Sequence, residues 1–162
     1  MTNLARAPSD PPAGGGSPTI GWGYRTDIGA TREQVSRALV RLNHELVGLG
    51  LERDALIPTE LVLAEVLNNI VEHAYGDSAQ GDIALEAAVH SNTIWCQVID
   101  FGRPMPGGKI PPALRYDLDA MKVSDLPEGG FGWGLIRDLT TNLIYERTGQ
   151  ENRLSLSIDL DC

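Results

Sequence analysis

The sequence predicts an α/β fold of the α+β two-layer sandwich type, in which helices cover one face of a mixed sheet. Apolar residues recur at helical spacing in two segments of the first half of the chain. In the segments that follow, apolar and polar residues alternate as in half-buried strands. The expected order is therefore a strand, two helices, two strands, a long loop, a helix and two strands.

The two helices of the first half are predicted from caps and apolar stripes. The first begins near Thr31, because Thr31 and Gln34 fit a capping box. Its stripe follows at spacings of four and three residues: Val35, Leu39, Leu42, Leu46 and Leu49. The second is expected over residues 58–75, because Pro58 suits a first helical turn and Gly76 suits the stop.

The strands are predicted from alternation and from the turn residues between them. Alternate residues from Ile83 to Val89 are apolar, and Ser91 with Asn92 offers a turn before the next strand. A third helix is expected over residues 132–141, and a closing hairpin is expected to turn over residues 149–152. The five expected strands cover residues 19–26, 83–89, 93–99, 142–148 and 153–160.

The charge of the chain limits the ligands that it can take. Its 162 residues carry 22 acidic and 13 basic side chains, a formal net charge of −9. Extended contact with nucleic acid or with an anionic membrane needs a basic surface, so neither is expected. A single phosphate site stays open, because backbone N–H groups and a metal ion hold phosphates without such a surface.

One domain is expected, because the chain length falls near the usual domain size. Residues 1–18 are rich in proline and glycine and are predicted to be a disordered tail, which leaves residues 19–162 for the domain. No apolar stretch suits a signal peptide or a membrane span, so a cytoplasmic protein is expected.

Polar residues line one side of the second predicted helix. Glu65, Asn69 and His73 are spaced by four residues, so they fall in a row along the helix. Such a row is also typical of a solvated helix face. Carboxylate and amide oxygens nevertheless suit a hard cation such as Mg²⁺, and Glu65 has the chemistry of a general base.

An aspartate directly ends an apolar strand. Asp100 closes this run and is followed, two residues later, by Gly102. A buried carboxylate requires hydrogen-bond donors, and the exocyclic amine of a purine is one candidate. Glycine at position 102 would let a flat ligand approach the backbone closely. The alternative is an ordinary Asp-x-Gly turn.

Glycines open the third predicted helix at positions 130, 132 and 134. Glycines at a helix N-terminus expose N–H donors where the helix dipole also favours an anion, so this segment is a candidate phosphate site. A flexible hinge is the alternative, and the likeness to the dinucleotide-binding fingerprint is superficial, because no strand precedes the glycines. The proline-rich loop before them, residues 103–128, is long enough to be a functional lid.

Taken together, the three motifs resemble a known family. Residues 65–75 resemble the N box of the Bergerat-fold (GHKL) ATPases, residues 100–104 the G1 box, and residues 130–135 the G2 box. Within that superfamily the chain resembles the anti-sigma-factor serine-protein kinases of bacterial partner-switching systems, over about residues 19–160. The resemblance implies a Bergerat-type ATP-binding fold with a mixed, mostly antiparallel sheet.

The resemblance also implies roles for the matching residues. Asn69 would coordinate Mg²⁺ on the ATP phosphates, and Glu65 would be the general base. Asp100 would accept a hydrogen bond from the adenine amine, and Gly102 would shape the adenine pocket. Residues 103–128 would form the ATP lid. The other cofactor-binding positions are His73, Gly130, Gly132 and Gly134, and His73 has a packing or orienting role as its alternative.

The implied activity is that of an ATP-dependent serine/threonine-protein kinase acting as an anti-sigma factor. It would phosphorylate a small anti-sigma-factor antagonist and sequester a sigma factor or sigma-like regulator, with a homodimer formed through the first helix and the neighbouring strand surface. The alternative is a non-catalytic ATP-binding module that traps a partner. Two departures bear on catalysis: the lid lacks an obvious basic cluster, and the bulky Trp133 stands within the glycine box.

Overall fold

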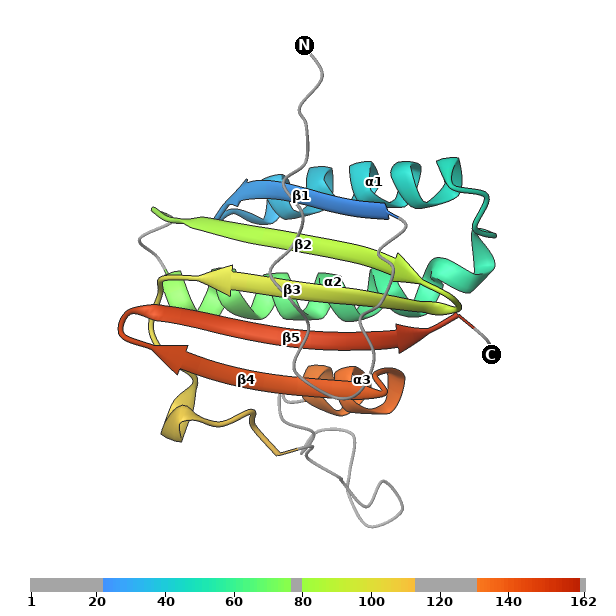
Figure 1. Ribbon diagram of the computed structural model, residues 1–162. Coiled ribbons are helices and arrows are strands. Elements are labelled where there is room, and N and C mark those ends of the chain that lie inside the picture. Colours follow the sequence, from blue (N-terminus) through green and yellow to red (C-terminus); the bar gives the residue numbers. More distant parts are fainter. Residues whose placement is uncertain (1–21, 77–79, 113–130, 161–162) are drawn as a thin grey trace, which may run out of the picture.

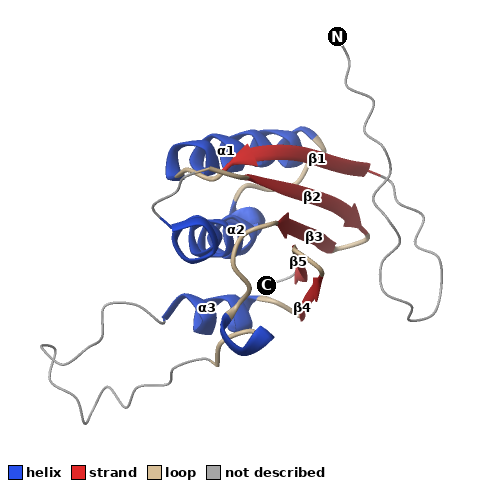
Figure 2. Ribbon diagram, turned by 90° about the vertical axis from the view of Figure 1, so that its left-hand side faces the viewer, coloured by secondary structure: helices blue, strands red, loops and turns tan. Residues whose placement is uncertain are grey.

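A computed structural model describes residues 22–76, 80–112 and 131–160 of the chain. Its five strands form one sheet in the order β1-β2-β3-β5-β4. Helices cover one face of this sheet (Figures 1 and 2), so the predicted two-layer α/β fold is confirmed. The strands are β1 (Trp22–Gly29), β2 (Asp82–His90), β3 (Thr93–Asp100), β4 (Asn142–Thr148) and β5 (Glu151–Asp159). The α-helices are α1 (Arg32–Gly48), α2 (Ile57–Asn69) and α3 (Phe131–Leu139).

Every neighbouring pair of these strands is antiparallel, so the prediction of a mixed sheet is wrong for the described residues. The hydrophobic pattern sets the register, because a slip of one residue would turn the apolar side chains to the other face. Leu85 pairs with Val98, and Val98 pairs with Leu154, so buried residues of three strands lie in one row under the helices. Strand β1 lies at an edge of the sheet and runs to Gly29, beyond the predicted end at residue 26.

Helix α1 begins where the capping box predicts. Thr31 is its N-cap, and the Thr31 hydroxyl accepts a hydrogen bond from the Gln34 N–H at 3.2 Å. The buried stripe consists of Val35, Ala38, Leu42 and Leu46. Leu49, which we expected in the same stripe, is 45% exposed because the helix ends at Gly48.

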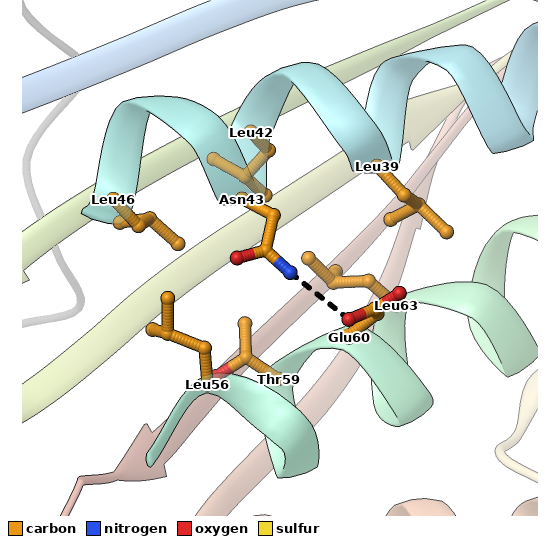
Figure 3. Close-up of a pocket in the computed structure, with 8 residues that line it drawn as sticks. All are labelled: Leu39, Leu42, Asn43, Leu46, Leu56, Thr59, Glu60 and Leu63. Carbon is orange, nitrogen blue, oxygen red and sulfur yellow. Dashed lines mark hydrogen bonds between the residues drawn. The ribbon is translucent and has the colours of Figure 1, made fainter. Parts of the chain in front are cut away.

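Helices α1 and α2 pack side by side, and Figure 3 shows their contact. Asn43 Nδ2 donates to Glu60 Oε2 at 2.9 Å across it. A cavity of about 10 Å³ lies beside this bond, which is room for about one water molecule and too little for a nucleotide. The other residues that line it are Leu39, Leu42, Leu46, Leu56, Thr59 and Leu63. A nucleotide site therefore has to be sought elsewhere in the fold.

The second predicted helix, residues 58–75, is only partly α-helical. After Asn69 it continues as a π-helical turn, η2 (Ile70–Tyr75). The prediction of one continuous α-helix is wrong at this end, because a π turn holds an extra residue and shifts every later side chain around the axis. As a result Tyr75 is buried, whereas Ala74 is only half-buried.

The tyrosine at the end of the π turn ties the helix to the sheet. The Tyr75 hydroxyl donates to the Asp82 carbonyl at 2.8 Å and accepts from the Phe101 N–H at 3.1 Å. Asp82 begins β2, and Phe101 follows the last residue of β3. The π turn thus fixes the helix end against two neighbouring strands at the same edge of the core.

The closing hairpin turns more tightly than we expected. The predicted turn over residues 149–152 is wrong by two residues, because β5 already begins at Glu151. Gly149 has a φ of +62°, which glycine adopts without strain and which suits a two-residue hairpin turn. Asn152 therefore lies inside β5, directly opposite Asp100 of β3.

The third helix is confirmed as α3, with slightly earlier bounds than predicted. The predicted tail, residues 1–18, lies outside the described residues, as does the part of the expected lid from 113 onwards. The described start of that loop includes a 3₁₀ turn, η4 (Pro106–Gly108). Among the described residues, no helix is both long enough and apolar enough to cross a membrane.

Two leucines of α2 test this packing. Leu67 is 0% exposed, whereas Leu61 is 45% exposed on the same helix. Leu67→Ala should lower the free energy of unfolding by about 2–5 kcal/mol, because it removes buried methyl groups and leaves a cavity. The matched control Leu61→Ala should cost less than about 1 kcal/mol, as surface changes usually do. Urea denaturation measures both, and equal losses would contradict the packing.

Candidate functional site

A buried carboxylate marks one end of the candidate site. Asp100, the last residue of β3, is 4% exposed. Its Oδ1 accepts hydrogen bonds from the Gly102 N–H at 2.9 Å and from Asn152 Nδ2 at 2.8 Å. The second oxygen takes no hydrogen bond that the structure shows among the described residues. Asp100 therefore keeps one oxygen with which to accept a donor from a ligand.

The surroundings of Asp100 act on its charge in opposite directions. Burial has the largest effect and raises the pKa of the carboxyl group above its usual value. The hydrogen bonds from Asn152 and from the Gly102 backbone, and the positive charge of Arg147, lower the pKa. A carboxylate that burial has partly stripped of water gains from any further donor, such as the amine of a bound base.

Gly102 is required by a close approach of the chain to the π turn. A Cβ at this position would lie 2.7 Å from the Cβ of Ala74 and 2.7 Å from its carbonyl oxygen. The neighbouring Arg103 N–H donates to that same carbonyl at 2.9 Å. We expected this glycine to admit a flat ligand, and the contact that the structure shows is with the end of the helix.

The other end of the site lies where α2 faces α3. Glu65 and Asn69 are both partly buried on α2. A Cβ on Gly132 would lie 2.5 Å from Glu65 Oε2 and 3.8 Å from Asn69 Nδ2. The fold thus brings the first turn of α3 against the two polar residues of α2. That turn carries N–H groups without partners inside the helix, and the helix dipole favours an anion there.

The remaining predicted residues differ in their placement. His73 lies in the π turn with an exposed side chain, so it no longer continues the row of Glu65 and Asn69. Gly134 lies in the first turn of α3, two residues beyond Gly132. Gly130 lies outside the described residues.

The donor set beneath α3 fits Mg²⁺ that arrives with phosphate. Among the described residues, no group of three or more His, Cys, Asp or Glu could hold a metal ion by itself. Mg²⁺ is commonly held by one or two protein oxygens together with water and substrate phosphates, and Glu65 and Asn69 carry such oxygens. The buried Asn69 Nδ2 has no hydrogen-bond partner in the described part of the chain.

Three residues around Asp100 were not predicted from the sequence: Tyr145, Arg147 and Asn152. A signal for Asn152 was present in the strand pattern. It occupies the inward position of β5 that Leu154 and Leu156 fill further along, and it is 3% exposed. Because a polar residue on a buried face requires a partner, Asn152 had to meet another buried polar group.

These elements define the class of protein. The chain belongs to the histidine kinase-like ATPase domain family, whose model matches residues 28–158. The match contains Glu65, Asn69 and Asp100, together with the first turn of α3. The resemblance to the GHKL superfamily that we inferred from the three motifs is thereby confirmed.

Individual proteins similar to the chain carry a more specific name. The chain is 27% identical over 112 residues to the serine-protein kinase RsbW of Oceanobacillus iheyensis, and the match covers 69% of this chain and 71% of that protein. It is 28% identical over 109 residues to the serine-protein kinase RsbW of Bacillus thuringiensis, covering 65% and 67%. A crystal structure of the RsbU and RsbW domains of a Mycobacterium tuberculosis protein shares the fold, with a TM-score of 0.57 at 16% identity. That match covers 85% of this chain and 32% of the other.

Two glycines of the site should respond differently to alanine. In Gly102→Ala the new Cβ meets the backbone of Ala74, which cannot move without the π turn, so the free energy of unfolding should fall by about 1–3 kcal/mol. In Gly132→Ala the Cβ meets the end of the flexible Glu65 side chain, and alanine favours the helix, so stability should stay the same or rise. Thermal unfolding of both variants measures this, and a Gly132→Ala loss as large as that of Gly102→Ala would refute the assignment.

Proposed function

We propose that the protein is a cytoplasmic ATP-dependent serine/threonine-protein kinase that acts as an anti-sigma factor. The observation that supports this most directly is that one helix serves both ends of the site. Glu65 and Asn69 of α2 lie against Gly132 of α3, while the π turn that extends α2 packs against Gly102, next to Asp100. A nucleotide would then lie along α2, with its base at Asp100 and its phosphates at α3.

In this proposal, adenine is recognised by Asp100. The free carboxylate oxygen would accept a hydrogen bond from the exocyclic amine of adenine, a bond to a charged group that is stronger than a neutral one. Guanine carries a carbonyl oxygen in place of that amine, and two acceptors would then face each other. Gly102 keeps the chain beside Asp100 tight against the π turn, so the edge of the base pocket has a fixed position.

The phosphates would be held by backbone amides in the first turn of α3, including Gly132 and Gly134, as helix N-termini hold anions elsewhere. Asn69 would hold Mg²⁺ through its amide oxygen, and the ion would neutralise negative charge on the phosphates. Gly130, which lies outside the described residues, and the exposed His73 of the π turn complete the set of proposed nucleotide-binding positions.

Glu65 would act as the general base. It would take the proton from a serine or threonine hydroxyl of the substrate protein, and that oxygen would form a bond to the γ-phosphorus. The bond between the γ-phosphorus and its bridging oxygen would break, and ADP would leave. The close approach of Glu65 to the first turn of α3 supports this role, because it places the carboxylate beside the proposed phosphate site.

The proposed protein substrate and partner follow from the similar proteins. Their name, serine-protein kinase, supports a serine-bearing protein as the phosphate acceptor. We propose a small anti-sigma-factor antagonist for this role, and a sigma factor or sigma-like regulator as the sequestered partner. A homodimer through α1 and the neighbouring strand surface belongs to the same proposal. The net charge of −9 supports protein partners over nucleic acid.

Asp100→Asn tests adenine recognition. The wild-type protein should bind Mg–ATP and reject Mg–GTP. The variant should bind ATP about 10- to 100-fold more weakly, because a hydrogen bond to a charged group is replaced by a neutral amide. Isothermal titration of both nucleotides measures this, with Asp82→Asn as the matched control. Equal affinity of the wild type for ATP and GTP would rule out the role of Asp100.

Glu65→Gln tests the transfer step separately from binding. The variant should retain ATP affinity but lose at least about 100-fold in the rate of phosphate transfer, as removal of a general base commonly does. Transfer is followed with labelled ATP and a small antagonist protein that co-purifies with the kinase. Glu60→Gln, on the same helix but away from α3, is the matched control and should transfer normally. ATP binding without transfer by the wild type would instead favour the non-catalytic partner trap.

A further inference from the structure

One buried amide, that of Asn152, connects every segment around Asp100. Its Nδ2 donates to Asp100 Oδ1 at 2.8 Å and lies within hydrogen-bond distance of two backbone carbonyls, at 3.2 Å from Gly102 O and 3.3 Å from Arg103 O. These acceptors belong to the end of β3 and to the chain that follows it. The amide nitrogen therefore holds the carboxylate and the adjoining backbone in one arrangement.

The other side of the same amide is held by β4. Asn152 Oδ1 accepts from the Tyr145 hydroxyl at 2.7 Å and from Arg147 Nη1 at 2.5 Å. The Tyr145 hydroxyl also accepts from the Met105 N–H at 3.2 Å. The bonds form a chain of donors in one direction, from Met105 through Tyr145 and Asn152 to Asp100. Hydrogen bonds aligned in this way polarise and strengthen one another.

The neighbours of Asn152 determine which of its two amide positions must be the oxygen and which must be the nitrogen. An arginine donates and never accepts, so the atom facing Arg147 must be an oxygen. A backbone carbonyl accepts and never donates, so the atom facing Gly102 O must be a nitrogen with hydrogens. An amide meets both conditions at this position. An ionised aspartate has nearly the same shape and would place a second negative charge against Asp100 and the two carbonyls.

We propose that Asn152 is the positioning residue of the base pocket: it holds Asp100 Oδ1 so that the other carboxylate oxygen faces the adenine amine. This rests on the proposed ATP-binding function. Because Asn152 also holds the backbone of residues 102 and 103, and through Tyr145 the N–H of Met105, recognition of the base is coupled to the placement of the chain from Gly102 to Met105. Asn152 itself does not need to touch the nucleotide.

The proposal predicts a specific effect on the titration of Asp100. Among the described residues, the charged or titratable groups that face it are Arg147 of β4 and Tyr75 of the π turn, and the other donors are the Asn152 amide and the Gly102 N–H. Loss of the Asn152 donor removes a contribution that lowers the pKa of Asp100, so the carboxyl group should bind a proton at higher pH. In Asn152→Asp the added charge should move this midpoint further upward.

The experiment compares Asn152→Asp with Asn142→Asp, which adds the same charge to the neighbouring strand but away from Asp100. At neutral pH, Asn152→Asp should bind Mg–ATP at least about tenfold more weakly and discriminate less between ATP and GTP. The carboxyl resonance of Asp100, followed by NMR in the free protein, should titrate at higher pH than in the wild type. Asn142→Asp should change neither property.

Two further variants test whether the effect of Asn152→Asp arises from misfolding. Asn152→Ala should show the same direction with a smaller shift in titration, and Tyr145→Phe should weaken ATP binding about two- to fivefold while keeping the ring in place. Unchanged titration of Asp100 and unchanged ATP affinity in a folded Asn152→Asp variant overturn the positioning role and leave the proposed function intact. A wild-type protein that binds no ATP overturns the proposed function and the positioning role with it.

Discussion

Burying the Asp100 carboxylate costs free energy unless donors surround it, and its donors come from segments far apart in the sequence. The Gly102 N–H lies in the turn after β3, and Asn152 lies in β5. Each of these donors is held in turn, Gly102 by its contact with Ala74 and Asn152 by Tyr145 and Arg147 of β4. The position of the Asp100 carboxylate therefore depends on the β3–β5 register, on the π turn and on the closing hairpin.

Helix α2 carries this constraint to the other end of the site. Its apolar side is the centre of the core, with Leu63 and Leu67 fully buried, so the helix cannot shift without losing that packing. The polar side of the helix, with Glu65 and Asn69, consequently has a fixed position under α3. The π turn lets the same helix also end against Gly102. Helix α2 and its π turn thus set the spacing between the Asp100 carboxylate at one end of the site and the first turn of α3 at the other.

The fold followed from the sequence where one local rule decided it. Thr31 and Gln34 gave the start of α1, and alternation gave β2 and β3 with their turn. The π turn could not be predicted, because it depends on where Tyr75 finds the Asp82 carbonyl and the Phe101 N–H, contacts that exist only once β2 and β3 are in place. The motifs identified Asp100 and Glu65 as candidate site residues. They did not identify Asn152, because the predicted hairpin turn was two residues too long and included Asn152.

The chain carries a net charge of −9, and two of the described arginines near the site are already bonded to backbone carbonyls. Arg147 binds the Asn152 amide and the Gly102 carbonyl, and Arg137 donates to the carbonyls of Ile110 and Pro111. These arginines hold the two ends of the described loop rather than a phosphate. In the proposed function, the phosphates would instead be held by the amides of α3 and by Mg²⁺, whose charge arrives with the ligand.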